Sequence, residues 1–454
     1  MIRRTLREIQ EMVKGSGLRP EFEQLEIAGV NIDSRQIEPG NVYIPILGAR
    51  VDGHDFLAGA RANGAAAVLW LQGRAGAPED FPVIFVADTE KALQGLATAY
   101  RDQLNIKIVG ITGSNGKTST KDIMASILGA KFKVHKTAGN FNSEFGMPLT
   151  ILRAEPEAEV AVLEMGMRGM HQINLLSTIA RPDAAIITNI GEAHIEELGS
   201  RENISIAKFE IKDGLKDGGI FVYHGDEPLL VSKVVRLKAP NYRIETFGDT
   251  SSNDYYPTSM KITETGMSFT IAQSDVVFQL PVLGKHNVMN ALAAMAVARD
   301  FGMSFEEIQQ GMKNLEMTAM RMEVVKAESG FTIINDAYNA SPTSVKATLD
   351  LLVSLKGYSK KIAVLGDMLE LGDREITYHE ETGAYLDPAH IDLVLTFGPL
   401  AKHLAAHSKV ADTRAFEDKE ALAAALKDAA APDAIALVKG SRGMKLEDVI
   451  DQLL

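Results

Sequence analysis

Apolar runs of strand length alternate with helical patterns along most of this chain. In the middle third the strand-like runs each end in polar residues, and they lie at 106–112, 160–163, 184–188 and 220–223. In the last third, runs at 332–334, 362–365, 393–396 and 435–438 are separated by helical patterns at about 344–355, 399–406, 419–429 and 446–453. Such alternation is typical of α/β architecture with mostly parallel sheets. We therefore predict an α/β fold with polar side chains at the carboxyl ends of its strands.

Two stretches depart from this pattern. Residues 255–283 hold three strand-like runs around Gly266, which predict a small antiparallel sheet, and an alanine-rich helix from about 287 to 301 follows. The first hundred residues hold only short strand candidates, at 42–46, 66–69 and 83–86. A chain of 454 residues favours about three domains. We place these domains at residues 1–100, 101–318 and 319–454, the last being a Rossmann-like unit.

The net charge and the absence of cysteine exclude several classes of function. The formal net charge of -13 argues against a general nucleic-acid binder. The absence of cysteine excludes disulfides, thiolate nucleophiles and Cys-ligated zinc. Residues 1–13 have the spacing of an amphipathic helix without the continuous apolar segment of a signal peptide, and no run is long enough to span a bilayer. We expect a cytoplasmic protein that does not insert into membranes.

A glycine loop follows the first strand of the middle third. Its sequence, residues 110–120, joins that strand to a helix marked by Ile123, Met124, Ile127 and Leu128. Backbone N–H groups in such a loop, together with the helix N-terminus, bind phosphate oxygens. Lys117 is placed to reach the β- and γ-phosphates and the Thr118 hydroxyl to bind Mg²⁺. The loop is shorter than the common pattern, and its candidate ligands are Gly113, Ser114, Asn115, Gly116, Lys117, Thr118 and Ser119.

Three further side chains are candidates for metal binding and chemistry. Glu164 ends a strand and would suit a second Mg²⁺, although a solvated loop carboxylate is an equal alternative. His194 follows a strand, where a structural, hydrogen-bonded histidine is the alternative. Lys208 has the pattern of an ordinary surface-helix lysine, and nothing in its spacing indicates another role.

Several loops offer polar groups for ligand binding. The amides of Asn287 and Asn290 are able to read adenine, with a helix cap as the alternative for Asn287. The segments 335–342 and 438–442 each follow a strand, and Asp336 and Ser341 are either ligand groups or strand and helix ends. The first domain carries two polar loops, at 33–35 and 52–54.

These segments, in this order, resemble the Mur ligases, a family that joins amino acids to the peptidoglycan precursor in the bacterial cytoplasm. The resemblance covers essentially the whole chain and rests on the co-linear set, not on one motif. The residues that carry the resemblance are the phosphate-loop segment 112–119, Glu164 and His194. Further along the chain they are Ala207-Lys208 followed by Glu210-Ile211, then His286-Asn287 with Asn290, and Arg321 followed by Asp336.

Within the family, the segments 139–150, 335–342 and 365–372 look like the members that attach D-alanyl-D-alanine to UDP-N-acetylmuramoyl-tripeptide. Ser143 stands where many of those members have a second asparagine. The members that add the third residue usually carry an Asp-Asn-Pro-Arg motif in the last domain, and this chain has none.

The resemblance implies an ATP-dependent, ADP-forming ligase. The sequence does not give the oligomeric state, and we expect a monomer. The resemblance implies a first domain for the UDP-sugar, a second for ATP and a third that closes over both and helps to bind the dipeptide. It implies that Thr118, Glu164 and His194 hold magnesium, two ions in all, and that Lys208 is carbamylated and also binds metal. Lys117, Lys208, His194 and Glu164 would then be the catalytic set.

The resemblance also implies which residues contact each ligand. Asn287 and Asn290 would lie near adenine, and Arg321 and Asp336 near the ribose and phosphates. The substrate contacts would be Ser34, Arg35, Asp52, His54, Asn140, Asn142, Tyr338 and Asn339.

Other functions share parts of this pattern. A nucleotide-driven motor or helicase would share the phosphate loop, but the short loop and the acidic balance count against it. An ATP-dependent binding or scaffold protein would bind ATP without turnover. A sister Mur ligase and folylpolyglutamate synthase are the alternatives within the ligase class.

Overall fold

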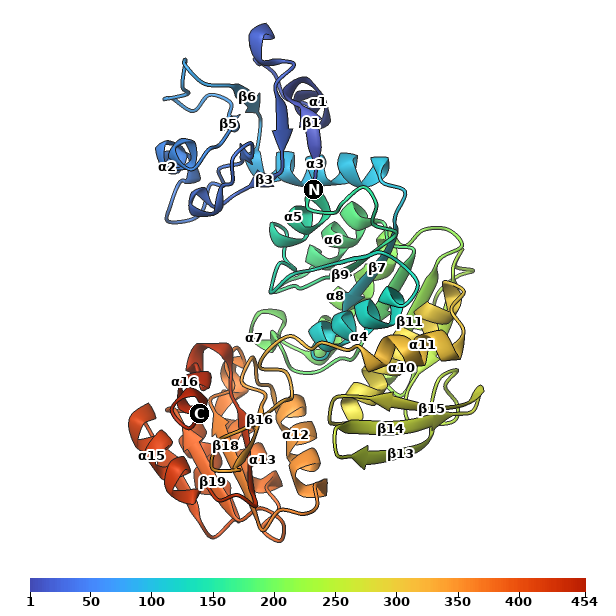
Figure 1. The fold of residues 1–454 in the computed structure, drawn as a ribbon, viewed down its shortest axis with the longest axis vertical. Helices are drawn as coiled ribbons and strands as arrows, with labels where there is room; N and C mark the ends of the chain where they lie inside the picture. The colour runs from blue at the N-terminus through green and yellow to red at the C-terminus, as the bar shows by residue number, and fades with distance from the viewer.

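The structure is a computed structural model that describes residues 1–454. Its three units follow one another along the long axis of the molecule (Figure 1): an N-terminal unit from β1 to α3, a central unit from β7 to α11 and a C-terminal unit from β16 to α16. The fold class predicted from the sequence, α/β with parallel sheets and one small antiparallel sheet, is confirmed. No helix is both long and apolar enough to cross a membrane.

The N-terminal unit contains a two-stranded sheet and a four-stranded parallel sheet in the order β3-β4-β5-β6. Its elements are β1 Arg3–Thr5, α1 Leu6–Met12, β2 Glu26–Ala28, β3 Val30–Asn31, β4 Val42–Tyr43, α2 Leu57–Ala62, β5 Ala67–Leu71, β6 Val83–Val86 and α3 Thr89–Gln103. The prediction of one helix over residues 1–13 is wrong at its start, because β1 pairs with β2 and Thr5 caps a helix that begins at Leu6.

The central unit is built on a six-stranded parallel sheet in the order β12-β11-β10-β7-β9-β8. Its strands are β7 Lys107–Thr112, β8 Val134–Lys136, β9 Val160–Glu164, β10 Ala184–Ile187, β11 Ile220–His224 and β12 Arg243–Phe247. Its helices are α4 Lys117–Gly129, α5 Gly146–Leu152, α6 Gln172–Ala180, α7 Ile195–Leu198, α8 Arg201–Phe209, α9 Pro228–Val234, α10 Lys285–Asp300 and α11 Phe305–Lys313. The predicted antiparallel sheet is β13 Pro257–Thr263, β14 Gly266–Ile271 and β15 Ser274–Leu280.

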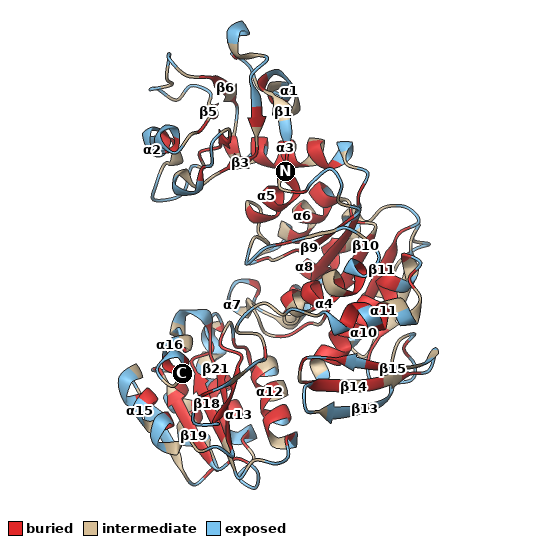
Figure 2. Ribbon diagram, viewed as in Figure 1, coloured by how far each residue is buried: buried red, intermediate tan, exposed pale blue.

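The inner strands of the central sheet are buried (Figure 2), and successive residues of a strand face opposite sides of the sheet. Val109 and Ile111 belong to the core that contains α4 and α10, whereas Ile108 belongs to the core that contains α3, α5 and α6. Helix α10 is buried nearly all round, which its alanine-rich sequence permits, since a helix without a polar face has to be enclosed. The sheet is therefore covered on both faces, and only the ends of its strands are open to ligands.

The C-terminal unit has a second six-stranded sheet, in the order β16-β17-β21-β18-β19-β20, in which only β16 is antiparallel. Its strands are β16 Glu323–Lys326, β17 Thr332–Asn335, β18 Lys360–Gly366, β19 Leu393–Phe397, β20 Thr413–Phe416 and β21 Ala434–Lys439. Its helices are α12 Pro342–Ser354, α13 Glu375–Tyr385, α14 Ala401–His407, α15 Lys419–Ala429 and α16 Glu447–Asp451.

Two connections join the units. The boundary predicted near residue 101 falls in the last turn of α3, where the Arg101 guanidinium donates to the carbonyls of Ala180 and Arg181 in the central unit. The boundary predicted near 319 falls in the segment 314–322, which has no regular structure between α11 and β16. The C-terminal unit is thus tethered by a single irregular linker.

Candidate active site

The glycine loop lies between β7 and α4, as predicted. Gly113 and Gly116 have φ angles of 153° and 81°, and a Cβ at either position would collide with Thr188 or Asn290. The N–H groups of Ser114 and Asn115 donate to Asn189, which follows β10. The end of the neighbouring strand therefore fixes the shape of this loop.

Lys117, the first residue of α4, folds back over the loop. Its Nζ donates to the carbonyl oxygen of Gly113 at 2.9 Å. Burial lowers the pKa of Lys117, while the carboxylate of Glu164 acts in the opposite direction. The ammonium is thus held at the mouth of the loop by a carbonyl and by a nearby negative charge.

Glu164 ends β9 and is 2% exposed. One carboxylate oxygen accepts from the Thr118 hydroxyl at 2.9 Å, and the other accepts from the Asn142 side-chain amide at 2.8 Å. The solvated-carboxylate alternative is wrong for Glu164. The structure brings together Thr118 from the start of α4, Glu164 from the end of β9 and Asn142 from the loop before α5.

His194 stands just before α7 with a φ of 66°. Its Nδ1 lies 3.0 Å from a carboxylate oxygen of Glu370, but the atom is buried and its geometry makes no hydrogen bond. Burial, with the charges of Lys117, Lys208 and Arg168, lowers the pKa of His194 to about 3. The imidazole is therefore neutral, the form in which histidine binds metals.

Lys208 lies in α8 and is 1% exposed, and its side-chain amine has no ion-pair partner. The alternative that it is an ordinary surface lysine is wrong. Burial and the charge of Lys117 lower its pKa well below the ordinary value. A buried lysine without an acidic partner is costly in its charged form, so this environment favours the neutral amine.

A cavity of about 420 Å³, the first cavity, opens over the glycine loop. Helix α10 contributes Asn290 and His286 to its wall, and the C-terminal unit contributes Asp336 and Asn339. Asn287 does not line this cavity, because its side chain is fully buried and bonded to the Leu283 carbonyl and to Asn290. It is not the helix cap either, since Gly284 occupies that position.

Arg321 and Asp336, which come from the C-terminal part of the chain, line the first cavity together with the glycine loop. The Arg321 guanidinium stacks over the ring of Tyr338 at 4.0 Å and donates to the Thr118 hydroxyl at 3.4 Å. Asp336 pairs with Lys439 at 2.5 Å in a buried contact. Lys439 lies in the segment 438–442 that we predicted to offer polar groups at a strand end, but we did not single it out as a site residue.

A second cavity, of about 590 Å³, shares Lys117, Arg321 and Asn339 with the first. The central unit lines it with Asn140, Asn142, Glu164 and His194, and the C-terminal unit lines it with Tyr338, Leu369, Glu370 and Arg442. Four of the predicted substrate residues thus meet here, namely Asn140, Asn142, Tyr338 and Asn339. The segment 365–372 reaches the site through Leu369 and Glu370, whose side chains we had not assigned.

The other four predicted substrate residues lie in the N-terminal unit and line neither of these two cavities. Asp33 accepts from the main-chain N–H and the guanidinium of Arg35, and these bonds hold the pKa of Asp33 at about 2. Arg35 is otherwise exposed, and Ser34 begins the same short helical turn.

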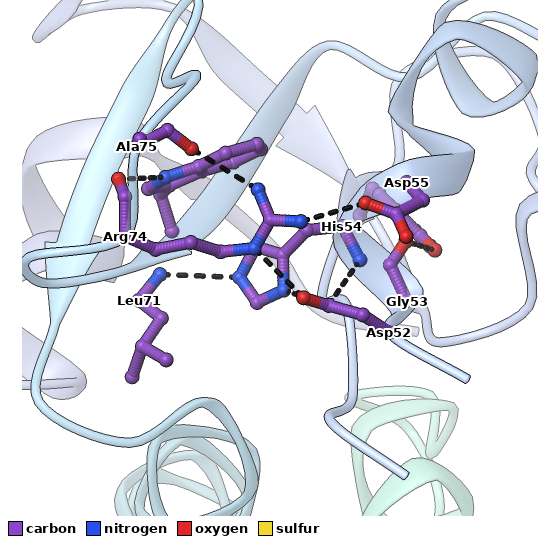
Figure 3. Close-up of polar contacts among 9 residues, drawn as sticks. Asp52, Gly53, His54, Asp55, Leu71, Arg74 and Ala75 are labelled. Atoms are coloured by element: carbon purple, nitrogen blue, oxygen red, sulfur yellow. Dashed lines mark hydrogen bonds and ion pairs between the residues drawn. The ribbon is translucent and has the colours of Figure 1, made fainter. Parts of the chain in front are cut away.

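Asp52 and His54 form a compact polar cluster with Arg74 (Figure 3). His54 is buried, with Nδ1 2.6 Å from Asp52 and Nε2 accepting the Leu71 N–H at 3.2 Å. Trp70 packs edge-on against the imidazole at 4.7 Å. Both ring nitrogens are occupied, so His54 holds the 48–54 loop in place and has no free nitrogen for a ligand.

Replacing Asp52 with asparagine is expected to destabilise this loop by about 1–2 kcal/mol, because charge-assisted hydrogen bonds are lost. Burial raises the pKa of Asp52, but bonds from His54 and Arg74 outweigh it and lower the pKa to about 2. The stabilisation is therefore present above the unfolded pKa and is lost as pH falls towards 2. Thermal unfolding across acidic pH should show a weaker pH dependence for Asp52→Asn than for the control Asp373→Asn, an exposed carboxylate outside this cluster.

Comparison with known proteins identifies the family to which the sequence of this chain is similar. Residues 26–101 match the model described as Mur ligase family, catalytic domain, 111–298 match the Mur ligase middle domain, and 320–442 match the Mur ligase, glutamate ligase domain. The UDP-N-acetylmuramoyl-tripeptide–D-alanyl-D-alanine ligase of Bacillus subtilis is 48% identical over 100% of this chain and 99% of its own length. The protein of that name from Escherichia coli is 32% identical over the same shares of each chain.

Solved structures agree with these relatives. A MurF structure from Acinetobacter baumannii has a TM-score of 0.91 and 29% identity, covering 100% of this chain and 99% of its own. A MurF ligase from Thermotoga maritima in complex with ADP has a TM-score of 0.83 and 31% identity over 94% of this chain and 96% of its own. A folylpolyglutamate synthase from Mycobacterium tuberculosis is only 17% identical at a TM-score of 0.63, and this likeness shows the fold alone.

Proposed function

The chain belongs to the Mur ligase family, and from this premise we propose that it joins D-alanyl-D-alanine to UDP-N-acetylmuramoyl-tripeptide at the expense of ATP, in peptidoglycan precursor synthesis. Full-length relatives of that name support this assignment. The observation that carries it is the junction of the two cavities at Lys117, Arg321 and Asn339. A phosphate donor in one cavity meets an acceptor in the other at these three residues.

The reaction we propose has two steps. A carboxylate oxygen of the tripeptide attacks the γ-phosphorus of ATP, the bond to the β-phosphate oxygen breaks, and an acyl phosphate and ADP form. The amine of D-alanyl-D-alanine then attacks the acyl carbon, loses a proton and expels inorganic phosphate, which leaves an amide. No protein nucleophile is needed, which accords with a chain that has no cysteine.

The chain's own residues address the main obstacle, which is the repulsion between a carboxylate and a polyphosphate. The loop N–H groups, Lys117 and Arg321 place positive charge where the two cavities meet. The Arg321 guanidinium already packs over the Tyr338 ring, so less of its motion has to be lost when substrate binds. Residues from the central and C-terminal units line the junction, so closure of these units over bound substrates would keep water from an acyl phosphate.

The residues present fit magnesium. Thr118 and Glu164 offer hard oxygen donors of the kind that Mg²⁺ prefers, and the buried Nδ1 of His194 is without a hydrogen bond. The chain has no cluster of three or more His, Asp and Glu side chains that would form a metal site alone. We propose that Thr118, Glu164, His194 and a modified Lys208 hold two Mg²⁺ ions, which would neutralise charge on the phosphates. Phosphate oxygens of ATP would complete the ligand sets.

The electrostatics of the centre support carbamylation of Lys208. The charge of Lys117 lowers the pKa of Lys208, and both lysines lower the pKa of His194. Attack of the neutral Lys208 amine on carbon dioxide, with loss of one proton, would replace this repulsion by an anionic oxygen donor. The buried amine has no other partner that would compete for it.

We assign the ligands to the cavities as follows. ATP occupies the first cavity, with its phosphates on 113–119, its adenine towards Asn290, and Asp336 near the ribose. Asn287 accepts a hydrogen bond from the side-chain amide of Asn290 and thereby orients that amide. The second cavity takes the tripeptide carboxylate and the dipeptide, and its Glu370 and Arg442 suit the two charges of a zwitterion. Ser34 and Arg35 bind the UDP part, and Asp52 and His54 shape the loop beside them.

One chain is enough for this function, because residues of a single chain line both cavities. We therefore propose a monomer. We also place the reaction in the cytoplasm, where ATP and nucleotide-linked precursors are available.

Phosphate release measured with ATP, Mg²⁺, UDP-N-acetylmuramoyl-tripeptide and D-alanyl-D-alanine, omitting one at a time, tests the assignment. We expect release only with all four, and a product heavier than the nucleotide substrate by one dipeptide. Release with a different amine would move the chain to a sister ligase. Release stimulated by nucleic acid would contradict the ligase assignment.

A further inference from the structure

One face of helix α4 holds the segment that leads to the C-terminal unit (Figure 1). Thr118, Asp122 and Ser126 are spaced four residues apart, so they lie on the same side of the helix. The Ser126 hydroxyl donates to the Gly311 carbonyl at 2.7 Å, Asp122 accepts from Thr318, and Thr118 accepts from Arg321. Residues 311–321 therefore run along the helix towards the phosphate loop.

The middle contact is the strongest of the three. One carboxylate oxygen of Asp122 accepts both the main-chain N–H of Thr318, at 2.9 Å, and its hydroxyl, at 2.7 Å. The other oxygen lies 3.0 Å from Lys136 and 3.4 Å from Lys121. Asp122 is 1% exposed, and a buried carboxylate is tolerated only when bonds of this kind satisfy it. The reaction described above makes no use of Asp122.

The backbone after Thr318 has an unusual course. Met320 and Met322, on either side of Arg321, have φ angles of 59° and 55°, which non-glycine residues rarely adopt. The Met320 N–H donates to Glu323 and the Met322 N–H donates to Asp336, both in the C-terminal unit. Arg321 is thus held between Thr318, fixed to the central unit, and Met322, fixed to the C-terminal unit.

We propose that Asp122 is a positioning residue that fixes Thr318 on the phosphate-loop helix and thereby sets where the Arg321 guanidinium stands between the two cavities. Asp122 lies one helical turn from Thr118, about 6 Å along the axis, and Arg321 lies three residues beyond Thr318. A shift of the linker at Thr318 therefore moves Arg321 relative to Lys117. The inference rests on the proposed function, since it takes the cavity junction to be the reaction centre.

Thr318→Val tests this without disturbing the buried charge, because it removes only the hydroxyl bond. We expect kcat to fall by about 10-fold or more, because small misplacement of a reacting group is costly. Affinity for ADP should stay within about threefold, since the loop and Lys117 are unchanged. Thr318→Ser, which keeps the hydroxyl, should restore kcat, and Glu316→Ala, in the same linker but exposed, should behave as the parent.

Asp122→Asn and its combination with Thr318→Val complete the test. If the two residues act through one contact, the double variant loses no more kcat than the worse single variant. Amide hydrogen exchange of 314–322 should rise in Thr318→Val and Asp122→Asn but not in Thr318→Ser. Normal kcat in Thr318→Val, equal loss in Thr318→Ser, additive losses, or unchanged exchange would overturn the inference. An inactive parent chain with normal exchange differences would instead contradict the proposed function.

Discussion

Replacing Lys117 with alanine is expected to lower turnover by about 10²–10³-fold, because one preorganised donor facing developing charge is worth this much in buried sites. Lys117 faces both cavities, and its ammonium is held at the loop by the Gly113 carbonyl. Its loss leaves the attacking carboxylate and the γ-phosphate to repel each other. Phosphate release with saturating substrates, after circular dichroism has confirmed an intact fold, measures the effect.

Lys107 provides the matched control for this variant. It lies at the other end of strand β7 with its ammonium over the ring of Phe301, far from either cavity lining. Lys107→Ala should keep turnover within about twofold, as exposed substitutions usually do. Near-normal turnover in Lys117→Ala, or equal losses in the two variants, would refute the role we give to Lys117.

The phosphate loop was predictable from the sequence because its elements are local. A strand, two glycines with positive φ angles and a helix start fall within one stretch of chain, and short-range geometry determines how they fold. Strand ends such as Glu164 were predictable for the same reason, since parallel strands deliver their carboxyl ends to one edge of the sheet.

Other features depend on which surfaces pack together, which one sequence does not reveal. Lys208 has the spacing of a surface lysine, and only the packing of α8 in the central unit shows it to be buried. Similarly, His54 has the residue type of a ligand group, yet its Nε2 accepts the N–H of Leu71, which lies 17 positions further along the chain. The pairing of Asp336 with Lys439 joins residues about a hundred positions apart.

In the N-terminal residues, a local helical pattern competes with strand pairing to a more distant segment. The spacing of apolar residues in 1–13 suits a helix throughout, but Arg3–Thr5 instead pairs with Glu26–Ala28. Thr5 and Glu8 then form a capping box, which starts the helix at Leu6. The capping signal was present in the sequence, while the strand partner was more than twenty residues away.

Replacing Lys208 with alanine is expected to lower turnover by about 10²-fold or more, because loss of a metal-supporting group typically costs this much. The small cavity left by the side chain should admit a short carboxylic acid such as acetate or propionate, whose carboxylate would stand where the carbamate oxygens were. Added acid should therefore restore part of the turnover in Lys208→Ala and none in Lys117→Ala. Rescue of only Lys208→Ala would show that this variant lacks a negatively charged group, whereas Lys117→Ala lacks a positively charged one.

Lys212 serves as the control for the modification itself, since it lies one helical turn further along, is partly exposed and pairs with Asp213. Lys212→Ala should keep its turnover and gain nothing from acid. In the parent chain, ¹³C-labelled bicarbonate should give a carbamate carbon signal that disappears in Lys208→Ala and persists in Lys212→Ala. Full activity of Lys208→Ala without acid, or a carbamate signal that survives this substitution, would show that the buried amine acts unmodified or that another lysine carries the group.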